Sequence, residues 1–261
     1  AFDADPAAGD RLTAQVPELL AAGCQERHEP GTADYSIRVH AGFAPGTARF
    51  EEAVAALGTI SYAFADLGSD DANIEGAMRL RTLFERMGIR PLLETVVEDA
   101  EKAKELNHAV NFLGEPYAVE TIGSLPSRYS EADILQSELE QEALKVHLLN
   151  GGQEKSFWRH EYNYRSSAAA AIHAHLRQQL AERQQKSGEE AAARPDPEAS
   201  ARQEHARWMA YIRSEGYIFS GTTDPGSRSD LGKMHPDLVP YEKLPPAETE
   251  KDKRTAGVIS D

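Results

Sequence analysis

The sequence predicts an α/β protein in which a partial parallel sheet is followed by a mainly α-helical domain. Two observations support this class. Between residues 1 and 123, short apolar runs alternate with amphipathic helical patterns, which is the signature of a parallel sheet with crossover helices. After residue 128, most apolar residues recur at three- and four-residue steps, as in helices. We therefore predict two domains, residues 1–128 and 129–261.

Composition and charge limit what the chain binds. Its 261 residues suffice for one large or two small domains. The formal net charge of -15 argues against a nucleic-acid or anionic-membrane surface, because either needs a basic face. No apolar run approaches the roughly 20 residues that a membrane-spanning helix requires. We expect no nucleic-acid partner and no membrane segment in this chain.

The start of the chain and its single cysteine bear on its origin and location. The first residues, AFDADP, contain no Met, so we expect a fragment or a processed form, and no signal peptide is visible. Cys24 excludes an internal disulfide and suits a reducing cytoplasm. No partner pattern surrounds Cys24, so we interpret it as a small surface or core residue. The expected location is cytoplasmic.

The first half is expected to contain five strands and four helices. Apolar runs predict strands at residues 1–6, 35–42, 60–68, 90–97 and 117–123. Helical patterns lie between them, at residues 11–23, 47–58, 71–88 and 100–107. In the longest helix, six apolar residues are expected to face the core: Ile74, Met78, Leu80, Leu83, Phe84 and Met87.

The second half opens with helical patterns. A helix is expected within residues 127–150, with Ser130 as its N-cap and Asp133 completing a capping box. A loop that carries three aromatic residues, Trp158, Tyr162 and Tyr164, then leads into an alanine-rich helix. Residues 186–200 form a charged connector that is rich in Ala and Pro.

The last part of the chain combines a helix with an ordered loop. Asp196 and Pro197 suit the N-cap and first turn of this helix, and Gly216 its C-terminal cap. Four of its residues share one face: His205, Trp208, Met209 and Ile212. Residues 217–219 lead out in an extended run, and the segment 221–233 holds too many turn-formers to be regular.

After this irregular segment, the two prolines of HPDLVPY predict an extended loop. Leu238 and Val239 lie between these prolines and are expected to pin the loop through their apolar side chains. A final helix is expected to start near Pro245, with acidic residues in its early turns and basic residues further along.

This order of features resembles the Ryr domain, the repeat that takes its name from ryanodine receptors and also occurs in bacterial proteins. The resemblance covers residues 129–261 and rests on a spaced set: His205, Trp208, Gly216, Tyr217, Gly221, His235, Pro236, Leu238, Pro240, Tyr241, Leu244, Lys251 and Asp252. The family more often has Trp after the helix-ending Gly, where this chain has Tyr217. Arg165, Ser166 and Ser167 resemble the arginine and serine that open the preceding helix in bacterial Ryr proteins.

Residues 1–123 resemble the later part of the Rossmann-like nucleotide-binding domain of bacterial potassium-transport regulators of the Trk/Ktr type. In that family an acidic residue ends the second strand and binds the adenosine ribose, and Asp3 or Asp5 matches it. The stretch at residues 66–81, which begins with Asp66, is similar to the family's segment after the fourth strand. The resemblance thus implies cofactor contacts from Asp3, Asp5 and Asp66.

The glycine-rich turn G-x-G-x-x-G, which cradles a pyrophosphate, is absent from the chain. A chain that begins at the second strand of such a sheet leaves a gap at its centre, and we expect upstream sequence to supply the first strand. NAD or another adenine nucleotide is then the expected cofactor, provided that upstream sequence completes the site. The alternative is a degenerate domain that no longer holds a dinucleotide.

The aromatic and histidine residues of the second half allow two interpretations. In one, His205 and Trp208 are core residues, while His235 and Tyr241 lock the proline-rich loop onto the helix. In the other, Trp208, Tyr217 and Tyr241 line a slot for a base or ring. Hydrogen bonds to the ligand then come from one or more of four residues: Arg165, Ser166, His205 or His235.

The sequence offers no evident reaction centre. The nine histidines have no metal-ligand spacing, and His173 and His175 are two residues apart, so they point to different faces of a helix. No nucleophile motif or phosphate-binding loop is present. We therefore name no catalytic residue and no metal ligand, and favour a protein that is not an enzyme.

Three functions follow, in order of preference. The first is a ligand-sensing regulatory module that binds a nucleotide or nucleotide-derived messenger and, by resemblance, controls an ion-transport or signalling assembly. The second is a non-enzymatic protein-interaction or structural module with a degenerate nucleotide site. The third is an enzyme that acts on a nucleotide, such as an NAD-cleaving activity. The resemblance also implies a homodimer and a membrane-protein partner or upstream domain.

Overall fold

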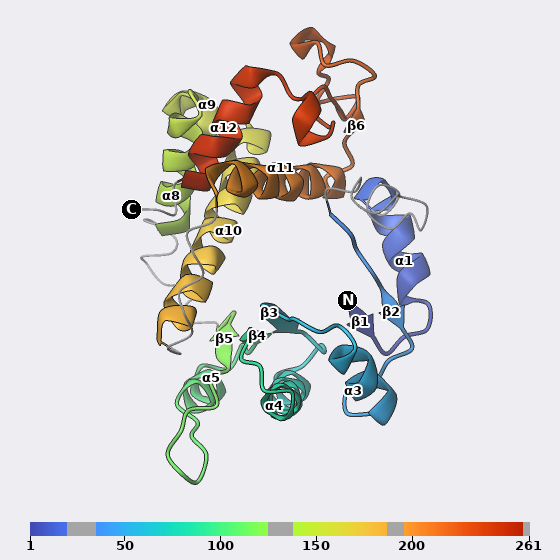
Figure 1. Ribbon diagram of the computed structural model, residues 1–261, viewed down its shortest axis with the longest axis vertical. Coiled ribbons are helices and arrows are strands. Elements are labelled where there is room, and N and C mark those ends of the chain that lie inside the picture. Colours follow the sequence, from blue (N-terminus) through green and yellow to red (C-terminus); the bar gives the residue numbers. More distant parts are fainter. Residues whose placement is uncertain (20–34, 125–137, 187–195, 258–261) are drawn as a thin grey trace. The chain divides into compact units, whose positions relative to one another are not determined.

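The computed structural model describes residues 1–19, 35–124, 138–186 and 196–257 (Figure 1). Contacts divide the chain into two compact units. The sheet unit comprises residues 2–6 and 40–137, and the helical unit residues 1, 7–39 and 138–261. Together the units form a mixed α/β protein. The predicted domain boundary after residue 128, the Ser130 cap with Asp133, and Cys24 all lie outside the described residues.

Residues 7–39 belong with the helical unit, although the sequence-based division assigns them to the first domain. The described part of this segment contains α1 (Ala8–Gln15), which ends just before Pro17. It also contains Tyr35, whose ring packs against the cluster of Met209 and Ile212. The Arg213 guanidinium donates a hydrogen bond to the Tyr35 hydroxyl at 3.3 Å. These contacts explain the grouping.

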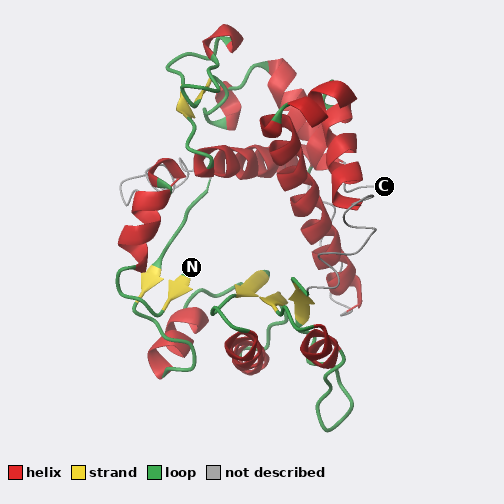
Figure 2. Ribbon diagram, turned by 180° about the vertical axis from the view of Figure 1, so that it is seen from behind, coloured by secondary structure: helices red, strands yellow, loops and turns green. Residues whose placement is uncertain are grey.

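Five short strands of the sheet unit confirm the five predicted strand positions (Figure 2). They are β1 (Phe2–Asp3), β2 (His40–Ala41), β3 (Tyr62–Ala65), β4 (Leu92–Val96) and β5 (Glu120–Ile122). All described ladders among them are parallel, in the orders β1-β2 and β3-β4-β5. The observed strands are shorter than the apolar runs that predict them.

Three helices of the sheet unit connect these strands: α3 (Ala48–Ala55), α4 (Asp70–Arg86) and α5 (Ala100–Asn107). Each begins after a residue whose side chain caps it, namely Thr47, Ser69 or Asp99. The side-chain oxygens of these short residues accept hydrogen bonds from the free N–H groups of the first turn. Of the six core residues predicted for this helix, Leu83 and Phe84 are buried in one hydrophobic cluster, and the other four are partly buried and pack against it.

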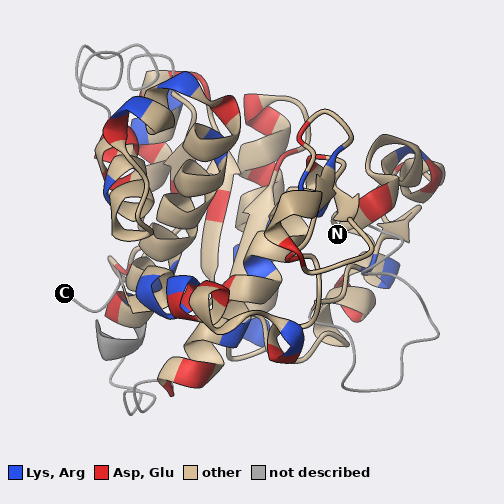
Figure 3. Ribbon diagram, turned by 90° about the horizontal axis from the view of Figure 1, so that it is seen from above, with Lys and Arg blue, Asp and Glu red and all other residues tan. Residues whose placement is uncertain are grey.

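The helical unit contains α8 (Glu138–Leu149), α9 (Glu154–Arg159), α10 (Glu161–Lys186), α11 (Pro197–Ser214) and α12 (Pro246–Gly257). Helix α10 packs on α8, and α11 packs on α12. Between α11 and α12, the strands β6 (Ile218–Phe219) and β7 (Met234–His235) pair in parallel. Acidic and basic residues are interspersed along the described helices (Figure 3).

The predicted loop around Trp158, Tyr162 and Tyr164 is wrong, because α9 and α10 cover this stretch. Phe157 explains the difference. Its side chain is fully buried and packs with the alanines of α8 and α10, so burial favours a helical turn there. The Ser156 hydroxyl closes the first turn of α9, donating to the Gln153 carbonyl at 2.7 Å.

Helix α11 begins and ends where the sequence predicts. The Asp196 side chain accepts a hydrogen bond from the Glu198 N–H, with Pro197 in the first turn. At the other end Gly216 has a φ of +85°, and the N–H of Tyr217 reaches the Ile212 carbonyl at 3.1 Å. This backbone arrangement is a Schellman motif, which favours glycine at that position.

The proline-rich loop lies against α11 as predicted. Leu238 and Val239 are buried, and a short 3-10 turn at Tyr241–Lys243 follows them. The His205 ring donates through Nε2 to the Val239 carbonyl at 2.8 Å, and this bond fixes the loop to the helix. The segment 221–233 holds only a 3-10 turn at Pro225–Ser227 and an isolated bridge at Ser229, in agreement with its turn-rich composition.

Candidate ligand-binding site

A cavity of about 530 Å³ lies within the helical unit. Its wall comes from the end of α8, the first turns of α10, the middle of α11, the loop before β7 and helix α12. The volume falls in the range of roughly 300–1,000 Å³ that is typical of small-molecule sites. The lining is mixed, with aromatic rings beside carboxylates and guanidinium groups. The cavity can therefore hold a small polar molecule that contains a ring.

One wall consists of aromatic rings around His235. The indole of Trp208 stands edge-on to the His235 ring, with ring centroids 4.9 Å apart. The Tyr162 hydroxyl lies 3.4 Å from His235 Nε2. The Asp237 N–H donates to His235 Nδ1 at 3.2 Å. Since Nδ1 accepts, the proton of the neutral ring sits on Nε2 and points at Tyr162.

Burial lowers the pKa of His235 to about 4, and the positive charge of Arg228 acts in the same direction. His235 is therefore neutral at physiological pH, which agrees with its hydrogen bonds. The ring accepts a hydrogen bond from the loop backbone and donates one to Tyr162, and it is uncharged.

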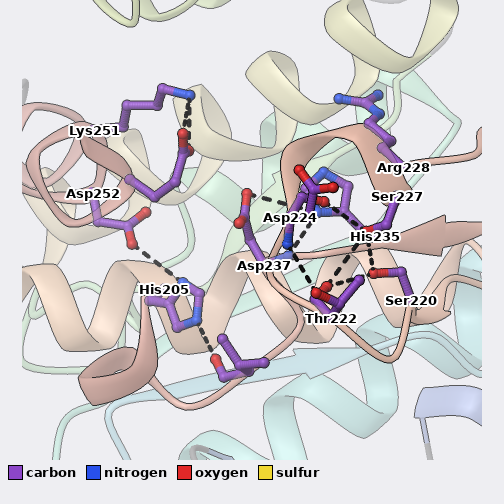
Figure 4. Close-up of polar contacts among 12 residues, drawn as sticks. His205, Ser220, Thr222, Asp224, Ser227, Arg228, His235, Asp237, Lys251 and Asp252 are labelled. Atoms are coloured by element: carbon purple, nitrogen blue, oxygen red, sulfur yellow. Dashed lines mark hydrogen bonds and ion pairs between the residues drawn. The ribbon is translucent and has the colours of Figure 1, made fainter. Parts of the chain in front are cut away.

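Two carboxylates of the wall are tied to neighbouring side chains. Asp252 on α12 lies with Oδ2 3.2 Å from Nδ1 of His205 (Figure 4). Glu204 is buried and accepts from the Arg207 guanidinium at 2.6 and 2.9 Å. Burial acts to raise the pKa of Glu204, but hydrogen bonds from His173 and Arg207 outweigh it and hold this pKa below its ordinary value. Both carboxylates thus stabilise the wall.

Asp237 differs from these two acids. Its carboxylate lies 3.8 Å from Nδ1 of His235, a ring that is neutral. Burial raises the pKa of Asp237 to about 6, and the neighbouring Glu248 contributes. The nearby Lys251 ammonium is engaged by Glu248 at 2.7 Å. Asp237 therefore presents to the cavity an acceptor that can exchange a proton near neutral pH.

The loop between the two short strands brings Arg228 to the cavity (Figure 4). Its shape is set by hydroxyl and carboxylate side chains: Ser220 and Ser227 share a hydrogen bond of 2.7 Å, and Asp224 caps the 3-10 turn. The Arg228 guanidinium lies over the Tyr162 ring, 4.1 Å from its centroid, and its Nε donates to Asp230 at 2.9 Å. A short polar loop thus adds a cation to the aromatic wall.

Four of the seven predicted ligand-binding residues of this half line the cavity: Ser166, His205, Trp208 and His235. The other three do not. The Arg165 guanidinium is half-exposed and pairs with Glu161 and Glu215. Tyr217 and Tyr241 are buried in packing clusters. The slot interpretation thus fits Trp208, and the packing interpretation fits the two tyrosines.

The predicted nucleotide contacts of the sheet unit lie at strand ends. Asp3 ends β1, and its carboxylate accepts from the Asp5 N–H at 2.8 Å. Asp66 follows β3 and accepts from the Gly68 N–H at 3.2 Å. Asp3 and Asp66 are exposed. These acids shape their own turns.

Sequence reasoning overlooked several residues of the cavity as candidates: Tyr162, Glu204, Arg207, Arg228, Asp237 and Lys251. For two of these residues the sequence did contain a signal. Asp237 lies inside the H-P-x-L motif, and Lys251 is one of the spaced motif residues. Tyr162 and Arg228 sit in stretches that the sequence marks only as loops, so no pattern pointed to them.

Comparisons with known proteins add no relatives: no family model matches the chain, and neither the curated proteins nor the solved structures contain a match. None of the helices in the described ranges is long and apolar enough to cross a membrane. Within the same ranges, no group of three His, Cys, Asp or Glu side chains is placed to hold a metal ion.

Proposed function

We propose that this chain is a ligand-sensing regulatory module whose helical unit binds a nucleotide or a nucleotide-derived messenger. The observation that carries the proposal is the cavity, where the Trp208 and Tyr162 rings meet Arg228 and the carboxyl group of Asp237. Aromatic faces stack on a base, while fixed donors and acceptors read its polar edge and its phosphates. In the cavity wall Nε2 of His147 lies 2.9 Å from the Ser156 hydroxyl. This hydroxyl donates its proton to the Gln153 carbonyl at 2.7 Å and caps α9, so binding suits the cavity better than catalysis.

The sheet unit supports a second, Rossmann-like part of the proposal. In a doubly wound sheet the first strand stands between the second and the fourth. The described ladders break at the corresponding place, because β1 pairs only with β2 and β3 only with β4. A strand from outside the described residues would complete such a sheet and, with it, a site for NAD or another adenine nucleotide. Control of an ion-transport or signalling assembly rests on the resemblances.

One observation favours the alternative, a protein-interaction module with a degenerate nucleotide site. The loop between α5 and β5 exposes two large apolar side chains, Phe112 at 95% and Leu113 at 69% of their surface. Exposed apolar pairs of this kind serve partner contacts. In this reading the cavity of the helical unit is a packing feature and takes no ligand.

Thermal-shift measurements with NAD, ATP and ADP-ribose separate the two proposals. A stabilising shift is expected with at least one ligand in the wild type and a smaller shift in Trp208→Ala, because the indole forms part of the cavity wall. Trp158→Ala is the matched control: Trp158 is 54% exposed on α9 and outside the cavity lining. The absence of a shift with every ligand, or equal shifts in wild type and Trp208→Ala, would reject the sensing function.

A further inference from the structure

The hydroxyl of Tyr162 receives hydrogen bonds from two directions. The His235 ring accepts from the Asp237 N–H at Nδ1, so Nε2 carries the proton that faces the Tyr162 oxygen at 3.4 Å. The Trp208 indole, which can only donate, also acts on this hydroxyl as a donor and lowers its pKa, against the larger effect of burial. Both contacts use the lone pairs of the Tyr162 oxygen.

The proton of the Tyr162 hydroxyl is left without an acceptor among the described residues. A phenol has one O–H donor, and its two known neighbours are themselves donors. Tyr162 lines the cavity, and burial raises its pKa to about 12, so the hydroxyl stays protonated. The Tyr162 side chain is partly buried in the wall, and an acceptor that arrives with a ligand would meet this donor.

Arg228 adds further donors beside Tyr162. Its Nε is used by Asp230, and its guanidinium lies 4.1 Å from the centroid of the Tyr162 ring. A guanidinium has five N–H donors, and within the described part of the chain the hydrogen bond of Arg228 to Asp230 uses the one on Nε. Arg228 also lines the cavity. The two residues therefore form one patch of hydrogen-bond donors.

We propose that Tyr162 and Arg228 together bind a phosphoryl oxygen of the ligand, and that Tyr162 is a specificity-determining donor of this cavity. The inference rests on the proposed function, since it names the part of a nucleotide that this wall recognises. A phosphoryl oxygen accepts several hydrogen bonds at once, and a guanidinium beside a hydroxyl suits it in charge and in geometry. In this arrangement the base of the nucleotide contacts the Trp208 ring and Asp237.

The test is calorimetric titration of ADP-ribose and of adenosine into the wild type and single variants. Tyr162→Phe removes the hydroxyl and keeps the ring under Arg228, and a weakening of ADP-ribose binding by about tenfold or more is expected. Arg228→Gln is expected to weaken it similarly, and because its loop position is exposed it serves if Tyr162→Phe fails to fold. Tyr164→Phe is the control, because that hydroxyl contacts Glu140 outside the cavity.

Adenosine, which lacks phosphates, separates recognition from a general structural effect. Its affinity is expected to be unchanged in Tyr162→Phe, or too weak to measure already in the wild type, and either result supports a phosphoryl contact. An equal loss for both compounds, or a Tyr162→Phe variant within twofold of the wild type for ADP-ribose, would overturn the inference while leaving the sensing function in place. Failure of the wild type to bind any nucleotide would overturn both.

Discussion

His205 places each of its two ring nitrogens against a hydrogen-bond acceptor: Nε2 lies 2.8 Å from the Val239 carbonyl, and Nδ1 lies 3.2 Å from the carboxylate of Asp252. The carbonyl can only accept, so Nε2 carries a proton. A second proton must then lie between Nδ1 and Asp252. Through its two ring nitrogens His205 joins α11 to the proline-rich loop and to α12. The cavity wall depends on both contacts.

Loss of Asp252 is expected to destabilise the helical unit. Asp252→Ala removes the carboxylate that faces Nδ1 of the buried His205, and a free-energy loss of roughly 3 kcal/mol is expected in chemical denaturation, as for other broken buried pairs. Asp252→Asn keeps a hydrogen-bonding group and should lose less. Lys253→Ala, next in sequence and bonded only to surface carboxylates, is the control and should change stability by less than about 1 kcal/mol. Equal losses in Asp252→Ala and Lys253→Ala would contradict the role of the pair.

Asp237 should make stability depend on pH. Burial raises its pKa from 3.8 to about 6, so its contribution is fully present below pH 3.8 and is lost as pH rises through 6. Asp237→Asn should therefore be more stable than the wild type at pH 8, by up to about 2 kcal/mol, with the difference vanishing near pH 4. Denaturation at pH 4, 6 and 8 measures this. A constant difference at all three would refute the assignment.

His235 changes stability with pH in the opposite direction to Asp237. It is present in both the wild type and Asp237→Asn. Burial lowers its pKa from 6.5 to about 4, so its contribution is present above pH 6.5 and is lost as pH falls through 4. Taking the difference between wild type and Asp237→Asn cancels this effect. The pH dependence that remains then reports on Asp237.

Gly216 is expected to resist substitution. Its φ of +85° ends α11, and an added Cβ would meet no other atom, so Gly216→Ala should cost about 1 kcal/mol through backbone conformation alone. Gly9→Ala is the counterpart, since Gly9 lies inside α1 with an equally open Cβ position and should gain up to about 0.5 kcal/mol. Thermal denaturation of both variants checks the sign. A stabilised Gly216→Ala would show that the turn does not require a left-handed residue.

Local patterns predicted the elements of the fold well. The caps at Asp196 and Gly216, the buried face of α4 and the pinned loop at Leu238 and Val239 follow from signals within a few residues of each other. The stretch around Tyr162 could not be predicted in this way. It is helical because Phe157 is buried against alanines of α8 and α10, a contact that no local pattern encodes.

The sequence by itself determined the α/β class, the order of strands and helices in the sheet unit, and which residues of α11 would face inward. Periodicity, caps and glycine positions are local properties, and they act before any distant contact forms. Only the tertiary structure decided that Tyr217 and Tyr241 are packed while Tyr162 and Arg228 line a cavity. The reason is physical: a cavity is bounded by side chains far apart in the chain, and their meeting depends on how the helices pack.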